Sequence, residues 1–180
     1  MYIEKESCTT REQEILWENI KELQTLNETL VVLYTQIKAN KPQKIPGIIA
    51  IIYNSLLVNF YVIMRRLLST QDERSLVTMY LKQTKSEFIP LDSDDELLEL
   101  FLPNSLSHWK AVKKYINKNI MHSERNNAAP PQDWSALKLI ISDMKSAFDR
   151  MTLPSASYSL DEEHTTREAT KLFNKIFKEK

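Results

Sequence analysis

Hydrophobic residues recur at steps of three and four along the first forty positions of the chain. This spacing places them on one face of a helix. Thr10 and Gln13 have the spacing of a capping box ahead of it. Because a residue before proline is pushed out of the helical region, the helix should end before Lys41 and Pro42. We therefore predict a long amphipathic first helix whose buried stripe is Ile15, Leu16, Ile20, Leu23, Leu26, Leu30, Leu33 and Ile37.

Residues 45–64 contain no charged side chain. A stretch of this length could span a bilayer. Against that, Asn54, Ser55 and Asn59 lie at its middle, and the other amphipathic helices need an apolar surface to cover. We predict a central core helix from Pro46 to about Leu68, with residues 48–64 buried. A helix anchored in a membrane is the alternative.

Two short helices should follow this core helix. The first carries Leu76, Met79 and Tyr80 and stops near Lys85. The second starts at the acidic residues 92–96 and stops at Pro103, with carboxylates at the end that the helix dipole favours. Calcium loops need glycine and alternating oxygen ligands, so we interpret the acidic residues as a helix start.

The next helix has one apolar and one basic face. Ser105 can cap it, and it should end around Met121 or His122. Its inward face is predicted to be Leu106, Trp109, Val112, Ile116 and Ile120. Its opposite face carries Lys110, Lys113, Lys114, Asn117 and Lys118.

A polar loop over residues 123–131 leads to the last part of the chain. Asp133 is placed to cap a fourth long helix, and a C-terminal helix is expected over about residues 160–179. The stripe of the fourth long helix is Leu137, Ile140, Ile141, Met144, Ala147, Phe148 and Met151. We predict an all-α protein in which residues 1–180 form a single up-and-down bundle of about five main helices. The presence of one glycine agrees, because sheets need glycine in turns and bulges.

Composition narrows the chemistry. Lys plus Arg and Asp plus Glu both number 24, so no net charge draws the whole protein to nucleic acid or an anionic membrane. Cys8 is the single cysteine, which cannot form an internal disulfide and indicates a reducing, cytoplasmic location. One Cys and three scattered His predict no metal site, and one glycine predicts no phosphate-cradling loop. We therefore expect no cofactor.

Of the three histidines, His122 has the sequence neighbours that best suit a functional site. His108 and His164 are interpreted as solvated helix residues. His122 follows a basic helix and precedes a polar loop, and its neighbours could bind a phosphate while the imidazole acts as acid or base. These neighbours are Lys114, Asn117, Lys118 and Arg125. The alternative is that His122 caps the helix end and the lysines form a solvated face.

Residues 116–125 resemble the signature of the HEPN superfamily, in the abortive-infection and toxin-like branch. Residues 52–79 are similar to the core helix of those relatives, and the likeness covers about residues 11–152. Asn117, Lys118 and His122 align with an Arg-Asn-Lys-x-x-Ala-His form of the motif. The position of the family arginine is Ile116 here, so the motif is degenerate.

The resemblance implies a metal-independent endoribonuclease. It makes His122 the catalytic residue and gives Lys114, Asn117, Lys118 and Arg125 to substrate binding. It also implies a homodimer that acts on RNA. An antitoxin or a nucleotidyltransferase is the expected protein partner, and no membrane is expected because residues 45–64 are interpreted as a core helix. An arginine fork would stabilise the phosphoryl transition state, and Ile116 cannot. The competing hypothesis is a non-catalytic, dimeric helical module that binds another protein.

Overall fold

The computed structural model describes residues 11–39, 47–84, 94–121, 133–152, 167–168 and 170–171. Within these ranges the chain is helical and contains no strand, which confirms the all-α prediction. The elements are α1 (Arg11–Ala39), α2 (Gly47–Leu67), α3 (Leu76–Thr84), α4 (Asp94–Phe101), α5 (Leu106–Tyr115), the π-helical turn η2 (Ile116–Met121) and α6 (Trp134–Met151). The ends of the first six helices expected from the sequence therefore agree with the structure to within a few residues, with α5 and η2 together forming one expected helix. Most of the expected C-terminal helix lies outside the described residues.

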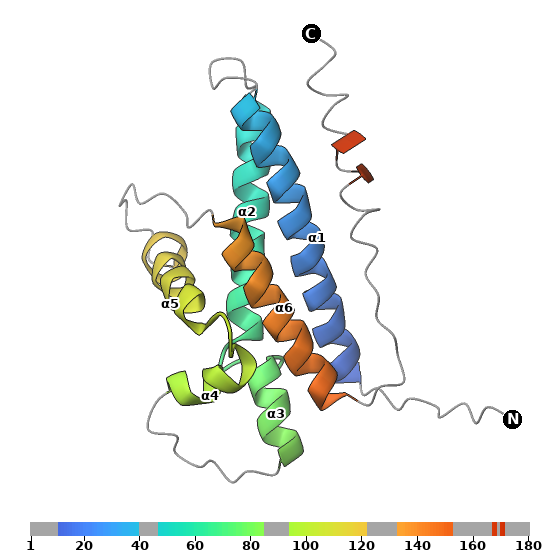
Figure 1. Cartoon of the computed structure of the whole chain (residues 1–180), viewed down its shortest axis with the longest axis vertical. Helices are drawn as coiled ribbons and strands as arrows, with labels where there is room; N and C mark the ends of the chain where they lie inside the picture. The colour runs from blue at the N-terminus through green and yellow to red at the C-terminus, as the bar shows by residue number, and fades with distance from the viewer. Residues whose placement is uncertain are drawn as a thin grey trace, which may run out of the picture.

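Helices α1 and α2 run antiparallel along the length of the molecule, and α6 packs against α1 (Figure 1). Helices α3 and α4 lie together at the end of the bundle where α2 ends, and α5 lies beside α6 (Figure 1). The apolar stripes of α1 and α6 form the core between these helices. Trp17 of α1 and Phe148 of α6 meet there with their ring centroids 5.6 Å apart.

The start of α6 follows the sequence prediction. The carboxylate of Asp133 accepts hydrogen bonds from the backbone N–H groups of Ser135 and Ala136, both at 3.1 Å. These donors have no partner inside the helix, so the cap satisfies them. The predicted stripe of α6 is buried from Leu137 to Phe148, and Met151 is half-buried.

The start of α5 differs from the prediction. Ser105 occupies the N-cap position but makes no side-chain cap hydrogen bond. Its hydroxyl instead donates to Oδ2 of Asp143 on α6. The reason is that a buried carboxylate, which needs several donors, lies within reach of the turn between α4 and α5.

Helix α2 lies at the side of the bundle and exposes one face. Phe60 and Ile63 are buried and Leu56 is half-buried, as predicted. The prediction that the whole of residues 48–64 is buried is wrong, because Ile48 and Ile51 are exposed. The other described helices cover only one face of α2.

By length and composition, α2 could also cross a membrane. It is the one helix in the described ranges that is long and apolar enough to do so, and 33% of its apolar 18-residue stretch is buried inside the structure. A core helix of a soluble protein can have the same length and apolar composition. The amide of Asn59 donates to Oε1 of Glu22 at 3.1 Å, so a polar residue at the middle of α2 holds it to a charged residue of α1. This contact favours a bundle helix over one that faces lipid.

Candidate functional site

Three of the five residues expected to form the functional site lie in the described part of the chain. Lys114 is exposed on α5, Asn117 is half-buried in η2, and Lys118 is exposed in η2. His122 and Arg125 lie outside the described residues. Two of the three expected cationic or polar groups on this segment, Lys114 and Lys118, therefore reach solvent.

The helix changes type where the resemblance places the family arginine. Ile116 opens η2, and its backbone N–H bonds to the carbonyl oxygens of Val112 and Lys113. Its side chain is fully buried in the core. A guanidinium at this position would point into an apolar interior, where an unpaired charge is strongly disfavoured. This position therefore differs from the family motif in two ways: the residue is not an arginine, and its side chain points into the core.

Three tyrosines line the packing between α2 and the end of α5. The rings of Tyr61 and Tyr115 lie 5.4 Å apart. Burial, together with nearby phenols, raises the pKa of Tyr53 to about 12. Burial likewise raises the pKa of Tyr61 and of Tyr115 above the ordinary phenol value. These hydroxyls stay protonated near neutral pH and are unsuited to act as general bases there.

Sequence reasoning missed a second basic cluster. Arg65 near the end of α2 and Lys113 on α5 line one cavity of about 170 Å³. Its other lining residues are Leu68, Ser69, Thr70, Gln71, Leu98 and Trp109. Periodicity assigned Lys113 to the basic face of its helix and gave Arg65 no role, and no sequence signal brings α2 and α5 together at these positions.

A second cavity shares part of this lining. That second cavity, of about 320 Å³, shares Arg65, Ser69 and Gln71 with the first and adds Val62, Arg66 and Asp72. Arg66 is already engaged, because its guanidinium donates to Oδ1 of the buried Asn19 on α1. Asp72 accepts a hydrogen bond from the backbone N–H of Arg74 at 2.8 Å.

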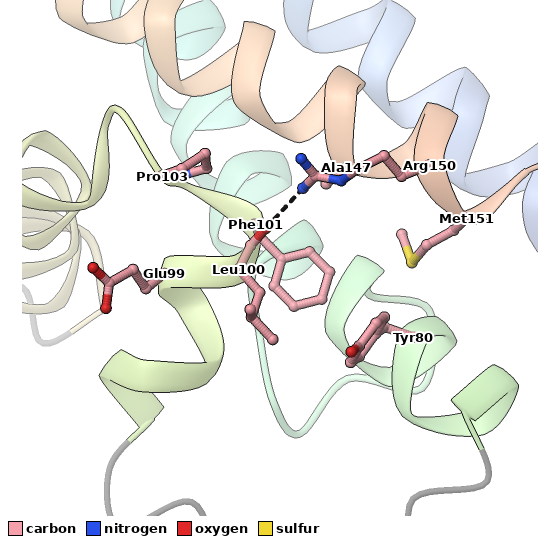
Figure 2. A pocket seen from close by; sticks show the side chains of 8 residues that line it. All are labelled: Tyr80, Glu99, Leu100, Phe101, Pro103, Ala147, Arg150 and Met151. Carbon is pink, nitrogen blue, oxygen red and sulfur yellow. Dashed lines mark hydrogen bonds between the residues drawn. The ribbon is translucent and has the colours of Figure 1, made fainter.

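A third cavity, of about 450 Å³, opens between α3, α4 and α6 (Figure 2). Its walls are mostly apolar, and Tyr80 meets Phe101 edge to face at 5.5 Å. The guanidinium of Arg150 donates to the backbone carbonyl of Leu100 at 2.7 Å, drawn as the dashed line in Figure 2. Among the described lining residues, Glu99 is the only carboxylate, and none is a histidine or cysteine. This cavity therefore offers apolar contact and little reaction chemistry.

No group of three or more His, Cys, Asp or Glu side chains that could hold a metal ion occurs among the described residues. No family model, curated protein or solved structure matches the chain. The fold class of an all-α helical bundle is established by the structure itself. The HEPN resemblance, the cytoplasmic location and the partners stay predictions.

Proposed function

We propose that this protein is a non-catalytic helical interaction module that works as a homodimer, with α2 of one copy packed against α2 of the other. The observation that carries the proposal is the exposed apolar face of α2. Ile48 is 60% exposed, Ile51 63%, Val58 46% and Val62 43%. Side chains of this kind expose together an area on the order of a few hundred Å², a size at which apolar patches on monomers are often functional.

The spacing of this face is typical of a helix that pairs with another helix. Residues 48, 51, 55, 58 and 62 follow alternating steps of three and four, which is the heptad pattern of a left-handed helix pair. We call Ile48, Ile51, Ser55, Val58 and Val62 the α2 seam. Its β-branched residues suit such packing, and the small Ser55 at its centre allows the two backbones to approach closely.

Charge favours an antiparallel arrangement of the two seams. The next position of the heptad pattern is Arg65. In a parallel pair it would lie beside the same arginine of the other copy, whereas an antiparallel pair separates the two arginines to opposite ends. That pairing sets Ile51 against Val62 of the second copy and Ser55 against Val58, a two-fold arrangement in which the helix dipoles also oppose.

Single charges on α2 test the dimer. Ile51→Glu and Val58→Glu each place a carboxylate in the seam, and we expect both variants to be monomeric, because a buried unpaired charge is strongly disfavoured. Ala50→Glu is the matched control, since Ala50 is exposed on α2 outside the seam. Light scattering coupled to size exclusion should report a dimer for the unchanged chain and for Ala50→Glu at micromolar concentration. A monomeric unchanged chain contradicts the proposal.

Thiol cross-linking tests the orientation. With Cys8→Ser as background, the double variant Ile51→Cys with Val62→Cys should cross-link readily with a short bifunctional reagent. The two single variants should not, because an antiparallel pair holds each single thiol far from its copy. Efficient cross-linking of both single variants would mean that the helices pair in parallel.

RNA binding at the His122 cluster is the second proposal. It is supported by Lys114 and Lys118, which are exposed and pair with no carboxylate in the described ranges. Because Ile116 is buried where the transition state needs a cation, we expect weak binding without cleavage. RNA cleavage in the presence of a metal chelator that vanishes in His122→Ala would instead establish a ribonuclease, since such proton transfers contribute about a hundred- to ten-thousand-fold in rate.

A further inference from the structure

We infer that the cavity between the end of α2 and α5 binds a phosphate group, held by Arg65 and Lys113. The inference does not depend on the proposed dimer. Two cations from helices distant in the sequence line the same small cavity. Both side chains belong to half-buried residues, and neither pairs with a carboxylate in the described part of the chain. Two like charges brought together in this way repel each other, and a bound anion would relieve that repulsion.

The lining offers donors rather than competing acids. No Asp or Glu is among the eight described residues that line this cavity. Ser69 accepts a hydrogen bond from the backbone N–H of Gln71 at 3.1 Å, which leaves the proton of its hydroxyl free to donate to a ligand. Thr70 and the side-chain amide of Gln71 add further donors. Asp72 lines the neighbouring cavity, and its carboxylate accepts a hydrogen bond from the backbone N–H of Arg74.

The end of α2 works against anion binding, since free carbonyl oxygens collect at a helix C-terminus. Two of these oxygens are already used, because the backbone N–H groups of Leu68 and Ser69 bond to the carbonyls of Met64 and Arg66. The opposing half-charge of a helix end is smaller than the two full positive charges of Arg65 and Lys113. The balance of charge therefore favours an anion.

The size of the cavity defines how much of a ligand it can take. A volume of about 170 Å³ is below the range of about 300–1,000 Å³ typical of pockets for whole small molecules. It suits one oxyanion group, such as a free phosphate, a phosphomonoester end or one phosphate of a nucleic-acid strand. Arginine is the appropriate cation for this group because its planar fork contacts two oxygens at once.

Trp109 supplies a reporter in the cavity wall. Its ring is buried, and its Nε1 is buried without a hydrogen-bond partner in the described part of the chain. An anion bound between Arg65 and Lys113 changes the electric field at this indole. Phosphate binding should therefore alter the tryptophan fluorescence, and the change should be absent in Trp109→Phe.

The experiment is a titration of the full chain with inorganic phosphate at low salt, in which binding is measured by calorimetry and by tryptophan fluorescence. We expect saturable binding that weakens on the order of tenfold to a hundredfold in Arg65→Gln and in Lys113→Gln, since each removes a charged hydrogen bond. Arg65→Lys should retain part of the affinity, because it keeps the charge and loses the fork. Lys110→Gln is the matched control, since it removes the same charge from α5 at a surface pair with Asp95 that lies outside the cavity. Circular dichroism checks that every variant is folded.

Two outcomes would overturn the inference. One is the absence of saturable phosphate binding at millimolar concentration. The other is an equal loss of affinity in Lys110→Gln, which would mean that only net charge matters. Competition with a phosphomonoester and with a short RNA separates the sources of the group, because the natural source should displace phosphate at lower concentration. Val58→Glu should bind phosphate as the unchanged chain does, which keeps this result separate from that of the dimer test.

Discussion

The hydroxyl of Ser105 donates a 2.7 Å hydrogen bond to Oδ2 of Asp143, across 38 positions of the sequence. Both residues are buried. The same carboxylate accepts from the backbone N–H of Asn104 at 3.0 Å and from its side-chain amide at 2.9 Å. A single carboxylate on α6 therefore fixes the turn between α4 and α5, and with it the orientation of the helix that carries Lys113 and Lys114.

We expect Asp143→Asn to lower the free energy of unfolding by about 2 kcal/mol or more, because a buried donor left unsatisfied costs about 1–3 kcal/mol. The new amide also presents a donor to groups that are themselves donors. Urea unfolding measures the change. Asp149→Asn, at an exposed position of the same helix, is the control and should stay within about 0.5 kcal/mol of the unchanged chain. Equal stability of the two variants would contradict the role given to Asp143.

Stability should fall at alkaline pH through Tyr53. Its pKa is raised from 10.0 to about 12, so the unfolded chain loses this proton at lower pH than the folded chain does. The resulting stability is fully present below pH 10 and is lost as the pH rises through about 12. Tyr53→Phe should reduce the loss between these values, as measured by urea midpoints at a series of pH values. A slope that is the same with and without the phenol would show that Tyr53 does not titrate in this way.

The same substitution should not destabilise the protein at neutral pH. The hydroxyl of Tyr53 is buried and has no hydrogen-bond partner in the described part of the chain. Removing such a group is nearly neutral or stabilising, with a gain of up to about 1 kcal/mol. Thermal unfolding near pH 7 tests this, and a clear loss would reveal a hydrogen bond to the hydroxyl in solution.

The contact between Trp17 and Phe148 should carry a large part of the packing between α1 and α6. Phe148 is fully buried, and Phe148→Ala should lower the free energy of unfolding by about 3–5 kcal/mol through lost transfer energy and a cavity. Phe148→Leu keeps most of the volume and should lose clearly less. Denaturant unfolding followed by tryptophan fluorescence measures both. A loss below 1 kcal/mol in the alanine variant would mean that the interface collapses around the missing ring.

Removing the cap of α6 should have a smaller effect. Asp133→Ala leaves the N–H groups of Ser135 and Ala136 without their acceptor, and we expect a loss of about 1 kcal/mol. Asp133→Ser can still accept a hydrogen bond and should recover most of it. Thermal unfolding of the three proteins is the measurement, and a serine variant no better than alanine would contradict a capping role.

Helix positions could be predicted because the spacing of apolar residues in each amphipathic helix indicates which of its faces is buried. The stripe of α6 and the boundary of α1 ahead of Pro42 are examples, since local spacing and proline geometry determine both. Helix α2 shows the limit of this reasoning. Apolar residues occupy nearly all of its sides, so the sequence does not reveal which side the bundle covers. Only the packing shows that Phe60 faces the core while Ile51 faces outward.

Contacts between distant residues account for what the sequence could not predict. Ser105 has a typical capping position, and only the nearness of Asp143 explains why its hydroxyl turns away. Arg65 and Lys113 each resemble an ordinary surface cation, and the cavity between them arises where α2 and α5 meet.

The turn η2 behaves like the insertion of one residue into a continuous helix. A π-helical turn closes its hydrogen bonds over five residues instead of four, so each turn holds more of the chain. Positions after Ile116 are consequently rotated relative to an α-helical continuation of α5. Deleting Asn117 would allow the segment to return to α-helical spacing. Lys118 would then keep the direction that it has now, because the π-helical turn already offsets the extra residue.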